Sequence, residues 1–557
     1  MLGAALALTA CTQQDQPPDT RLGDEPSGAE TRGAASPTRD EGPITLAFAG
    51  DAHFEFHLTR LFRNPGAGLG PIDDVLSDAD VTVVNLETAI TTRGEQEPKE
   101  LEVPENRYYF RTSPAALDVL AAAGVDAVTM ANNHGADYGV QGMRDTVRAK
   151  SESPISVIGV GRNRREAFAP YRVTVRGTEI AVVAADASPR EGASTLWGAT
   201  ADEPGIAAAR EPRPRVLLEQ VRRLARSADV VVVFLHWGRE YDSCATPAQQ
   251  ITAQALSRAG ADVIVGSHAH RLLGSGWHPD GSYVNYGLGN FVWYHDLAPE
   301  TGVLKLQLED GEVVSDEWVP ALIQPDGRPA PLTGSAAARA QAQWRATRTC
   351  SDVAAAPGER PVRFRSSIQP ISTGLQEQMA SSHSDRCPLG FDDLRYLWLS
   401  HVGFDGRVHT GELVVAASQA DTVVGVFREL FRTGYPIRRM RLVSEYGGND
   451  DRSMAANNTS AYNCRPVAGT ARWSDHAYGT AIDINPVQNP YLRDGAPVEP
   501  PAGRAFADLD RSAAAEPPWG VIHDGDVVVR AFNEAGWAWG GFWADPDYQH
   551  FTAGSPR

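Results

Sequence analysis

The stretch Ile44-Thr-Leu-Ala-Phe-Ala-Gly-Asp-Ala-His53 predicts a buried strand that ends in metal-binding side chains. Its first six residues are apolar apart from one threonine, which is typical of a strand covered on both faces. Asp51 and His53 follow this run directly. Because the loops after the carboxyl ends of strands form the site of an α/β sheet, the stretch predicts both the fold and the location of its chemistry.

The same pattern, an apolar run followed by polar residues, recurs along the N-terminal half. Helical runs separate the apolar runs, and two of them carry proline in the first turn, where it fits best. Alternating strands and helices predict an α/β domain. The predicted strands are 44–49, 81–84, 127–130, 180–184, 230–235 and 263–265, the helices are 114–123, 216–225 and 247–259, and a closing hairpin joins 303–308 to 312–319.

Five loops after these strands carry residue types that bind metals. One isolated histidine after a strand is usually a polar surface group, but five such loops indicate a metal centre, and its ligand count fits two ions. The two candidate sets are Asp51, His53 and His270 for one ion and Asn133, His236 and His268 for the other. Glu87 or Asp51 would bridge the ions, and His134 could protonate a leaving group. Mixed nitrogen and oxygen ligands suit Mn, Fe or Zn, and paired ions suit a displacement at phosphorus.

These loops resemble the calcineurin-like metallophosphoesterases, and more closely their capsule-synthesis branch, the CapA (poly-γ-glutamate synthesis) family. The matching motifs are Asn-Leu-Glu at 85–87, Ala-Asn-Asn-His at 131–134, His-Trp-Gly-x-Glu at 236–240 and Tyr-Gly-Leu-Gly-Asn-Phe at 286–291. The resemblance covers 43–345 and implies a metallophosphoesterase-like α/β sandwich that holds two divalent transition metals. It implies a role in capsule or poly-γ-glutamate polymer synthesis or attachment. The domain would act as a dinuclear hydrolase or, alternatively, as a non-catalytic factor that binds and assembles polymer.

A second constellation stands near the C-terminus. It reads Arg-Trp-Ser-Asp-His-Ala-Tyr-Gly-Thr-Ala-Ile-Asp-Ile-Asn at 472–485 and Asp-Tyr-Gln-His-Phe at 547–551. His476, Asp483 and His550 would fill three positions of a tetrahedral zinc ion and leave the fourth for water. Asp547 stands where a general base is needed. The alternative is a closed structural zinc site, which usually takes four protein ligands rich in cysteine.

This constellation resembles the VanY-type D,D-carboxypeptidases and L-alanyl-D-glutamate peptidases. Their Ser-x-His-x-x-Gly-x-Ala-x-Asp motif appears at 474–483, and their Asp/Glu-x-x-His motif appears at 547–550. The resemblance covers about 385–553 and implies a smaller α+β zinc peptidase domain that cleaves peptidoglycan stem peptides. An arginine near the zinc would stabilise the oxyanion, and Arg465 is favoured over Arg452 for that role.

Three tryptophans flank the second constellation, at Trp537, Trp539 and Trp543. They line a substrate cleft or pack in a core around a strand, and the sequence alone favours neither.

The first residues predict export and a lipid anchor. Leu8-Thr-Ala-Cys11 resembles a bacterial lipobox, in which Cys11 is lipidated and becomes the first residue of the mature protein. A short secretory leader with a chance cysteine is the alternative. The expected location is the outer face of the bacterial cell membrane, with the membrane reached through the lipid on Cys11.

Four further cysteines, Cys244, Cys350, Cys387 and Cys464, suit disulfide bonds in an exported protein. Three pairings are possible. Cys244–Cys350 with Cys387–Cys464 is favoured because each bridge then stays inside one predicted domain. Four free buried thiols are the alternative.

Chain length and net charge limit the number of domains and the classes of binding partner. A chain of 557 residues suits two or more domains. Lys and Arg number 51 against 70 Asp and Glu, and the net charge of −19 argues against binding of nucleic acid through a basic face. The predicted segments are a lipoprotein leader at 1–11, a disordered tether at 12–42, the first domain at 43–345, a linker at 346–370 and the peptidase domain at 371–557.

Overall fold

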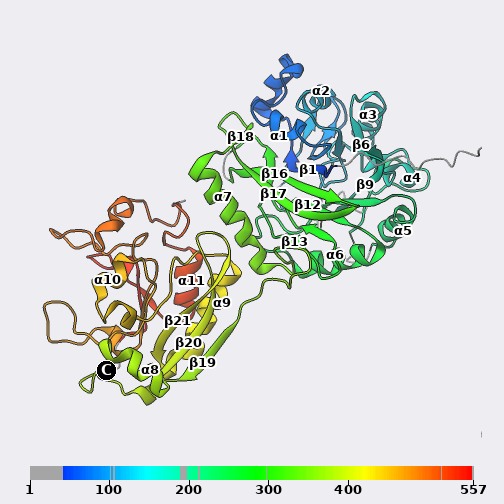
Figure 1. Cartoon of the computed structure of the whole chain (residues 1–557). Coiled ribbons are helices and arrows are strands. Elements are labelled where there is room, and N and C mark those ends of the chain that lie inside the picture. Colours follow the sequence, from blue (N-terminus) through cyan, green and yellow to red (C-terminus); the bar gives the residue numbers. More distant parts are fainter. Residues whose placement is uncertain are drawn as a thin grey trace, which may run out of the picture. The chain divides into compact units, whose positions relative to one another are not determined.

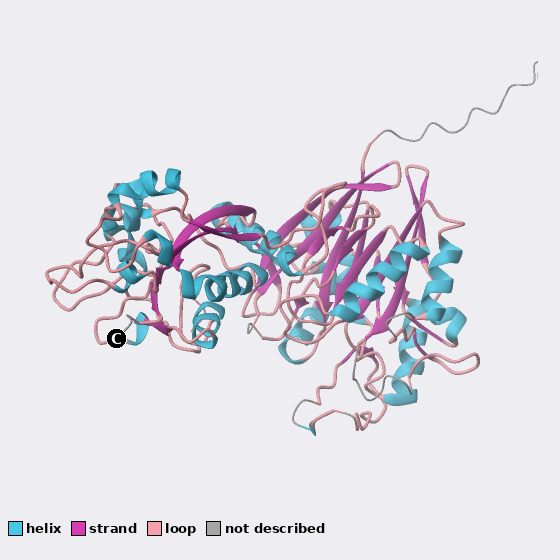
Figure 2. Cartoon of the chain, turned by 90° about the horizontal axis from the view of Figure 1, so that it is seen from below, coloured by secondary structure: helices cyan, strands magenta, loops and turns pink. Residues whose placement is uncertain are grey.

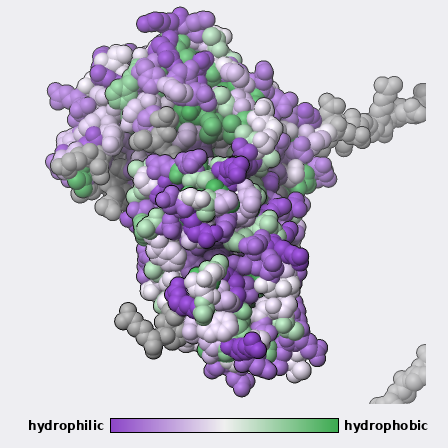
Figure 3. Space-filling view, turned by 90° about the vertical axis from the view of Figure 1, so that its left-hand side faces the viewer, coloured by the Kyte–Doolittle hydropathy of each residue, from purple (hydrophilic) through white to green (hydrophobic). Residues whose placement is uncertain are grey.

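The computed structural model describes residues 42–557 apart from 101, 105–106, 189–196, 211–213, 296–297, 516 and 555–557. Cys11 and the tether predicted at 12–42, up to residue 41, lie outside the described residues. None of the helices in the described part is long and apolar enough to cross a membrane. On the face drawn in Figure 3, hydrophilic residues dominate and hydrophobic residues gather only in small groups.

Two β-sheets form the centre of the N-terminal part (Figure 1). The first runs β18-β17-β16-β1-β2-β5-β6, with β15 beside β1, and the second runs β13-β14-β12-β11-β9-β8. The strands of the first sheet are β1 (Ile44–Ala52), β2 (Val81–Leu86), β5 (Ala127–Thr129), β6 (Ser156–Ile158), β15 (Asn290–Val292), β16 (Glu300–Glu309), β17 (Glu312–Ile323) and β18 (Pro329–Pro331). Those of the second are β8 (Tyr171–Val175), β9 (Thr178–Ala187), β11 (Val230–Trp237), β12 (Val263–Ser267), β13 (Ser275–Trp277) and β14 (Tyr283–Asn285).

Side-chain alternation explains why these sheets form a sandwich. In β1, Leu46 and Phe48 belong to a core that both sheets share, whereas Ala47 and Ala49 belong to a second core on the opposite face. Successive side chains of a strand point to opposite faces, so a strand that is apolar at every position is covered twice. Helices cover the outer faces, as Figure 2 shows. The observed fold is therefore the α/β sandwich that the sequence predicts.

The helices of this part are α1 (Asp73–Ser77), α2 (Ala115–Ala122), α3 (Gly139–Glu152), α4 (Arg164–Ala167), α5 (Arg215–Leu224), α6 (Pro247–Ala259) and α7 (Gly334–Ala346). The start of α6 shows how the sequence sets a boundary. Thr246 and Gln249 form a reciprocal capping box, Pro247 takes the first helical position, and Gly260 ends the helix at φ 104°. Two short two-stranded sheets complete the part, β3 (Ala89–Ile90) with β4 (Arg111–Thr112) and β7 (Val160–Gly161) with β10 (Gly205–Ile206).

The predicted strands and helices are confirmed, but several strands run further than expected. β1 includes Asp51, which pairs with Asn290 of β15, and β11 includes His236, which pairs with Ser267. The ladder continues through polar residues because neighbouring strands still supply backbone partners there. These two candidate ligands therefore stand on strand ends, not in the loops beyond them.

Residues 347–354 pack with the N-terminal part, although the sequence places them in a linker. The 3-10 helix Thr347–Cys350 follows α7, and Cys350 is bonded to Cys244, with 5.5 Å between their Cα atoms. Val353 is fully buried in the core that the sheets share, and Ala354 bridges to Trp277. The disulfide and this buried valine hold a segment that lacks the sequence pattern of a regular element.

In its described residues, the C-terminal part contains two small antiparallel sheets and four α-helices, with short 3-10 helices between them. One sheet contains β19 (Ser366–Pro370), β20 (Leu394–Val402) and β21 (Val408–Ala416), and the other contains β22 (Ala481–Asp483), β24 (His550–Thr552) and β23 (Ala538–Trp539). The helices are α8 (Thr373–Gln378), α9 (Ala420–Arg432), α10 (Asp450–Ala455) and α11 (Val527–Glu534). One core joins Phe427 of α9 and Phe532 of α11 to Leu413 of β21 and Phe551 of β24. This arrangement is the smaller α+β domain expected from the sequence.

A second disulfide lies in this part. Cys387 is bonded to Cys464, with 5.9 Å between their Cα atoms and 77 residues between them in sequence. The bond fixes the segment that carries Arg465 to the loop before β20.

Candidate metal centres

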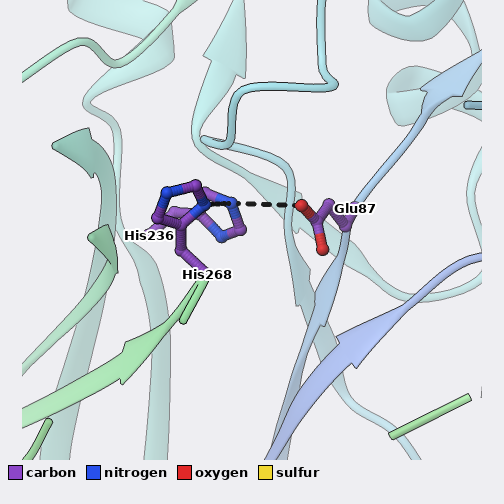
Figure 4. Close-up of side chains that lie close together, drawn as sticks. All are labelled: Glu87, His236 and His268. Carbon is purple, nitrogen blue, oxygen red and sulfur yellow. Dashed lines mark hydrogen bonds and ion pairs between the residues drawn. The ribbon is translucent and has the colours of Figure 1, made fainter. Parts of the chain in front are cut away.

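The polar ends of the central strands meet in the N-terminal sandwich. One ligand atom each of Glu87, His236 and His268 lies within 4.8 Å of the others, and all three residues are buried. Figure 4 shows the Glu87 carboxylate facing the two imidazoles, and its Oε1 lies 3.3 Å from His236 Nε2. His268 Nδ1 is 3.1 Å from the same His236 nitrogen. These three side chains could hold one cation.

A second group lies beside the first and shares one residue with it. Asp51, Glu87 and His270 also place one ligand atom each within 4.8 Å of the others. His270 Nδ1 is 3.6 Å from Asp51 Oδ2. Because Glu87 belongs to both groups, it is placed as a bridging ligand would be. Of the two bridging residues considered from the sequence, the geometry favours Glu87.

Hydrogen bonds fix the orientation of these groups. The backbone N–H of His268 donates to Asp51 Oδ2 at 3.0 Å, and Asn85 Nδ2 donates to Asp51 Oδ1 at 2.7 Å. His236 Nδ1 lies 2.9 Å from Ser267 Oγ, which leaves Nε2 directed at Glu87. His268 and His270 have φ angles of 88° and 52°. Backbone strain of this kind is concentrated at functional sites.

His53 and Asn133, the remaining predicted ligands, lie at the edge of the centre. The His53 ring stacks on Phe110 with 4.5 Å between centroids, and its Nε2 is buried without a hydrogen-bond partner among the described residues. Burial lowers the pKa of His53 well below its ordinary value, so its imidazole is neutral, the form that binds metals. Asn133 Oδ1 is 2.6 Å from His236 Nε2. Neither of the two compact groups includes His53.

His134, the predicted acid, is held by residues that the sequence reasoning missed. Its Nδ1 lies 2.6 Å from Asp137 Oδ2, and the buried Lys99 Nζ lies 2.9 Å from Asp137 Oδ1. Burial lowers the pKa of His134 to about 4. Asp137 follows His134 by three residues, a spacing visible in the sequence. Lys99 gives no such signal, because it belongs to a stretch without regular pattern. Asn85, which donates a hydrogen bond to Asp51, belongs to the Asn-Leu-Glu motif.

The C-terminal site is more compact. His476 Nε2 is 3.2 Å from Asp483 Oδ2, and His550 Nδ1 is 3.0 Å from Asp483 Oδ1. The two imidazoles approach each other to 3.3 Å. His476 Nδ1 donates to the Ala461 carbonyl at 2.6 Å, which leaves Nε2 free to face Asp483. Second-shell bonds of this type set the tautomer of metal-binding histidines.

Asp547 lies beside this group without belonging to it. Its Oδ1 is buried and has no hydrogen-bond partner among the described residues. Burial, reinforced by the charge of Asp483, raises the pKa of Asp547 to about 7. By contrast, His476 and His550 hold the pKa of Asp483 below its ordinary range, although burial opposes them. The two carboxyl groups thus differ in pKa: that of Asp483 suits a metal ligand, and that of Asp547 suits a group that exchanges a proton near neutral pH.

A cleft of about 380 Å³ opens onto these residues. Arg465 lines the cleft and forms an ion pair with Asp450, whereas Arg452 is exposed on α10. Of the three tryptophans, Trp537 and Trp539 are buried in the core. Trp543 is 45% exposed, lines the cleft and lies 5.3 Å from the His550 ring. Core packing therefore applies to Trp537 and Trp539, and lining of the cleft applies to Trp543.

The donor sets of both sites fit divalent metals. Each brings imidazoles and carboxylates together in a buried place, and in each a buried polar atom, Nε2 of His53 or Oδ1 of Asp547, has no hydrogen-bond partner among the described residues. Burying carboxylates and unpartnered polar atoms together costs folding free energy, and a bound cation would offset that cost. Two histidines and one aspartate suit zinc with an open fourth position. The N-terminal mixture with a shared carboxylate suits two transition metals.

Comparison with known proteins identifies two family regions. Residues 45–295 match the bacterial capsule synthesis protein PGA_cap, and residues 468–553 match a D-alanyl-D-alanine carboxypeptidase family. The capsule biosynthesis protein CapA of Bacillus anthracis is 28% identical over 53% of this chain and 71% of its own length. The PGA biosynthesis protein CapA of Bacillus subtilis is 28% identical over 46% of this chain and 65% of its own length. A probable polyglutamine synthesis accessory protein of Mycobacterium tuberculosis is 30% identical over 43% of this chain and 65% of its own length.

Among solved structures, a putative 5'-nucleotidase from Staphylococcus aureus is similar at 16% identity and a TM-score of 0.33, covering 54% of this chain and 58% of that one. A 5'-nucleotidase precursor from Thermus thermophilus is 14% identical, with a TM-score of 0.32. The match covers 52% of this chain and 56% of that one. By sequence, residues 45–295 match the bacterial capsule synthesis family, and residues 468–553 match the D-alanyl-D-alanine carboxypeptidase family.

Proposed function

We propose that the C-terminal domain is a zinc peptidase that cleaves peptidoglycan stem peptides, as a D,D-carboxypeptidase or an L-alanyl-D-glutamate endopeptidase. One observation carries the proposal. His476, Asp483 and His550 meet in a cleft that Asp547 also lines, with its Oδ1 buried. A closed structural zinc site would take a fourth protein ligand, and Cys464, which precedes His476 by 12 residues in sequence, is bonded to Cys387.

The residues of the cleft divide the reaction between them. A bound zinc ion supplies Lewis acidity, which lowers the pKa of water and polarises a carbonyl. Asp547 takes a proton from the attacking water and later gives it to the leaving amine, so that the amide C–N bond is replaced by a carboxylate and an amine. Arg465 offers its guanidinium to the oxyanion that develops on the carbonyl. Trp543 covers the His550 side of the cleft.

The full chain, incubated with purified muropeptides, is expected to release D-alanine or to split the L-alanyl-D-glutamate bond. Mass spectrometry of the products separates these two outcomes. A chelator should abolish cleavage, and added zinc should restore it, because the three side chains coordinate the ion reversibly. Cleavage that persists in a protein shown by metal analysis to be zinc-free would contradict the proposal.

For the N-terminal domain we propose a role in capsule or poly-γ-glutamate polymer synthesis or attachment, with two transition-metal ions at Glu87. The shared position of Glu87 favours a hydrolase with two metal ions. Because burial lowers the pKa of His134 to about 4, its imidazole is neutral at pH 7, and it would act as a proton donor only if binding of substrate raised that pKa. The similarity to capsule biosynthesis proteins supports the polymer as its context. A non-catalytic polymer-binding factor is the alternative, and it would need no proton donor at this place.

The chain is further proposed to be exported and anchored to the outer face of the cell membrane through lipid on Cys11. Cys11→Ser is expected to move the protein from the membrane fraction to the soluble exported fraction. A single acyl chain binds membranes only marginally, so stable attachment further predicts a multiply acylated Cys11. Fractionation and the mass of the N-terminal peptide measure both effects. An unchanged distribution would show that another element anchors the chain.

A further inference from the structure

A buried arginine lies at the carboxyl end of the second sheet and belongs to neither candidate ligand group. The Arg210 side chain is only 14% exposed, and its Nη2 donates to the fully buried carboxylate of Asp186. The other two guanidinium nitrogens, Nε and Nη1, are buried without a hydrogen-bond partner among the described residues. Because buried donors without an acceptor cost folding free energy, this guanidinium is suited to receive an acceptor from a ligand.

Strand register places this ion pair beside the N-terminal metal centre. Asp186 of β9 pairs with His236 of β11, and His236 pairs in turn with Ser267 of β12. Side chains at paired positions of parallel strands point to the same face of the sheet. On that face, His236 Nδ1 lies 2.9 Å from Ser267 Oγ. Asp186 therefore stands in one row with a candidate metal ligand, a single strand away from it.

The segment that carries Arg210 connects the two sheets at this edge. The Ala207 N–H donates at 2.8 Å to the carbonyl of Gly159, which directly follows β6 of the first sheet. The Ala207 carbonyl accepts the Asp186 N–H at 2.9 Å, and the Ala209 N–H donates to the Asp186 carbonyl at 2.7 Å. Main-chain hydrogen bonds to both sheets thus fix the backbone just before Arg210, at the edge where the polar strand ends meet.

Ser188 adds a second donor beside the guanidinium. Its backbone N–H donates to Asp186 Oδ1 at 3.0 Å, while its hydroxyl oxygen is buried without a hydrogen-bond partner among the described residues. Asp186 thus accepts from Ser188 at one carboxylate oxygen and from Arg210 at the other, which fixes the orientation of the guanidinium. Among side chains, a fixed guanidinium is the donor group that best matches the oxygens of a carboxylate or a phosphate.

We propose that Arg210, positioned by Asp186 and assisted by Ser188, binds an anionic oxygen group of the substrate, a carboxylate or a phosphate, at the N-terminal metal centre. This inference rests on the proposed metal centre, and it names the chemical class of the substrate. Bound metal ions attract anions through their charge, and the arginine adds a contact of fixed direction. A γ-linked glutamate polymer carries a carboxylate on every residue, so the assignment agrees with the polymer proposed as the context of this domain.

Two probes, inorganic phosphate and a short γ-linked glutamate peptide, are titrated into the metal-loaded full chain by isothermal calorimetry. Arg210→Gln is expected to weaken binding of at least one of them about tenfold, the effect of losing one hydrogen bond to a charged group. The metal content should stay the same, because Arg210 belongs to neither ligand group. A γ-linked isoglutamine peptide, in which carboxamides replace the side carboxylates, should bind weakly to the unaltered chain and lose little in Arg210→Gln.

Arg210→Gln alone leaves the Asp186 carboxylate buried without its partner, which can destabilise the fold. The double variant Arg210→Gln/Asp186→Asn removes both charges together, and it should show the same loss of anion affinity at a melting temperature close to that of the unaltered chain. Arg172→Gln/Glu179→Gln is the matched control, because it removes a more exposed ion pair from β8 and β9 of the same sheet. The control should keep both anion affinity and metal content.

Unchanged affinity for both probes in the single and double variants would overturn the proposal. An equal loss for the isoglutamine peptide would also overturn it, because the contact would then not depend on the anionic charge. A loss for phosphate alone identifies the bound group as a phosphate, and a loss for the glutamate peptide alone identifies it as a carboxylate. Two bound metal ions with an anion affinity that ignores Arg210 would refute only this inference, whereas no metal at these ligands would refute the proposed function of the domain.

Discussion

Asp547→Asn is expected to lower peptidase turnover about 10³-fold while the chain keeps its zinc. Asp547 stands outside the His476, Asp483 and His550 group, so the change removes no ligand. The asparagine amide has the same shape as the carboxyl group, but it cannot accept the proton of the attacking water. Burial raises the pKa of Asp547 to about 7, which matches a group that takes and returns a proton near neutral pH.

Turnover with muropeptides and zinc content by plasma mass spectrometry are the two measurements. Asp545→Asn is the matched control, because Asp545 is two residues away and exposed. It should keep both turnover and zinc. His476→Ala should lose both, since it removes a ligand. An Asp547→Asn protein with full activity would show that another group acts as the base.

The sequence was sufficient for the fold because its strands are apolar at nearly every position. Such runs are buried on both faces, and their length and spacing leave few other elements to choose. The same strands predicted where the site would be, since their carboxyl ends must meet. His236 is on β11, and His268 directly follows Ser267, the last residue of the neighbouring parallel strand β12. Because His236 pairs with Ser267, the two histidines converge as a consequence of register.

What could not be predicted depends on long-range packing. Lys99 and Asp137 come together around His134 across a segment without periodicity, and no local signal pairs them. The position of Glu87 between the two groups depends on how the strands twist, so the sequence left open whether Asp51 or Glu87 would bridge. The sequence places the segment after α7 in a linker, although it also favours the Cys244–Cys350 bond that ties this segment to the N-terminal domain.

Glu87→Gln is expected to cost the N-terminal centre both of its metal ions, whereas His268→Ala should cost only one. Glu87 is common to the two groups, and the other ligands of each group are not shared. The glutamine keeps the volume of the side chain but removes one of the two buried negative charges that face four positive charges. With Asp51 as the remaining carboxylate in these groups, repulsion between two divalent ions would exceed what neutral imidazoles offset.

Metal analysis of the full chain, prepared with Mn, Fe or Zn and with the C-terminal zinc counted separately through His476→Ala, measures the effect. The unaltered N-terminal centre should hold about two ions, His268→Ala about one, and Glu87→Gln fewer than one. Glu312→Gln, an exposed glutamate on the hairpin of the same domain, should leave the count unchanged. Two ions retained in Glu87→Gln would contradict the bridge. Equal losses in Glu87→Gln and His268→Ala would mean that the two groups hold a single ion, because only a shared ligand removes more metal than an unshared one.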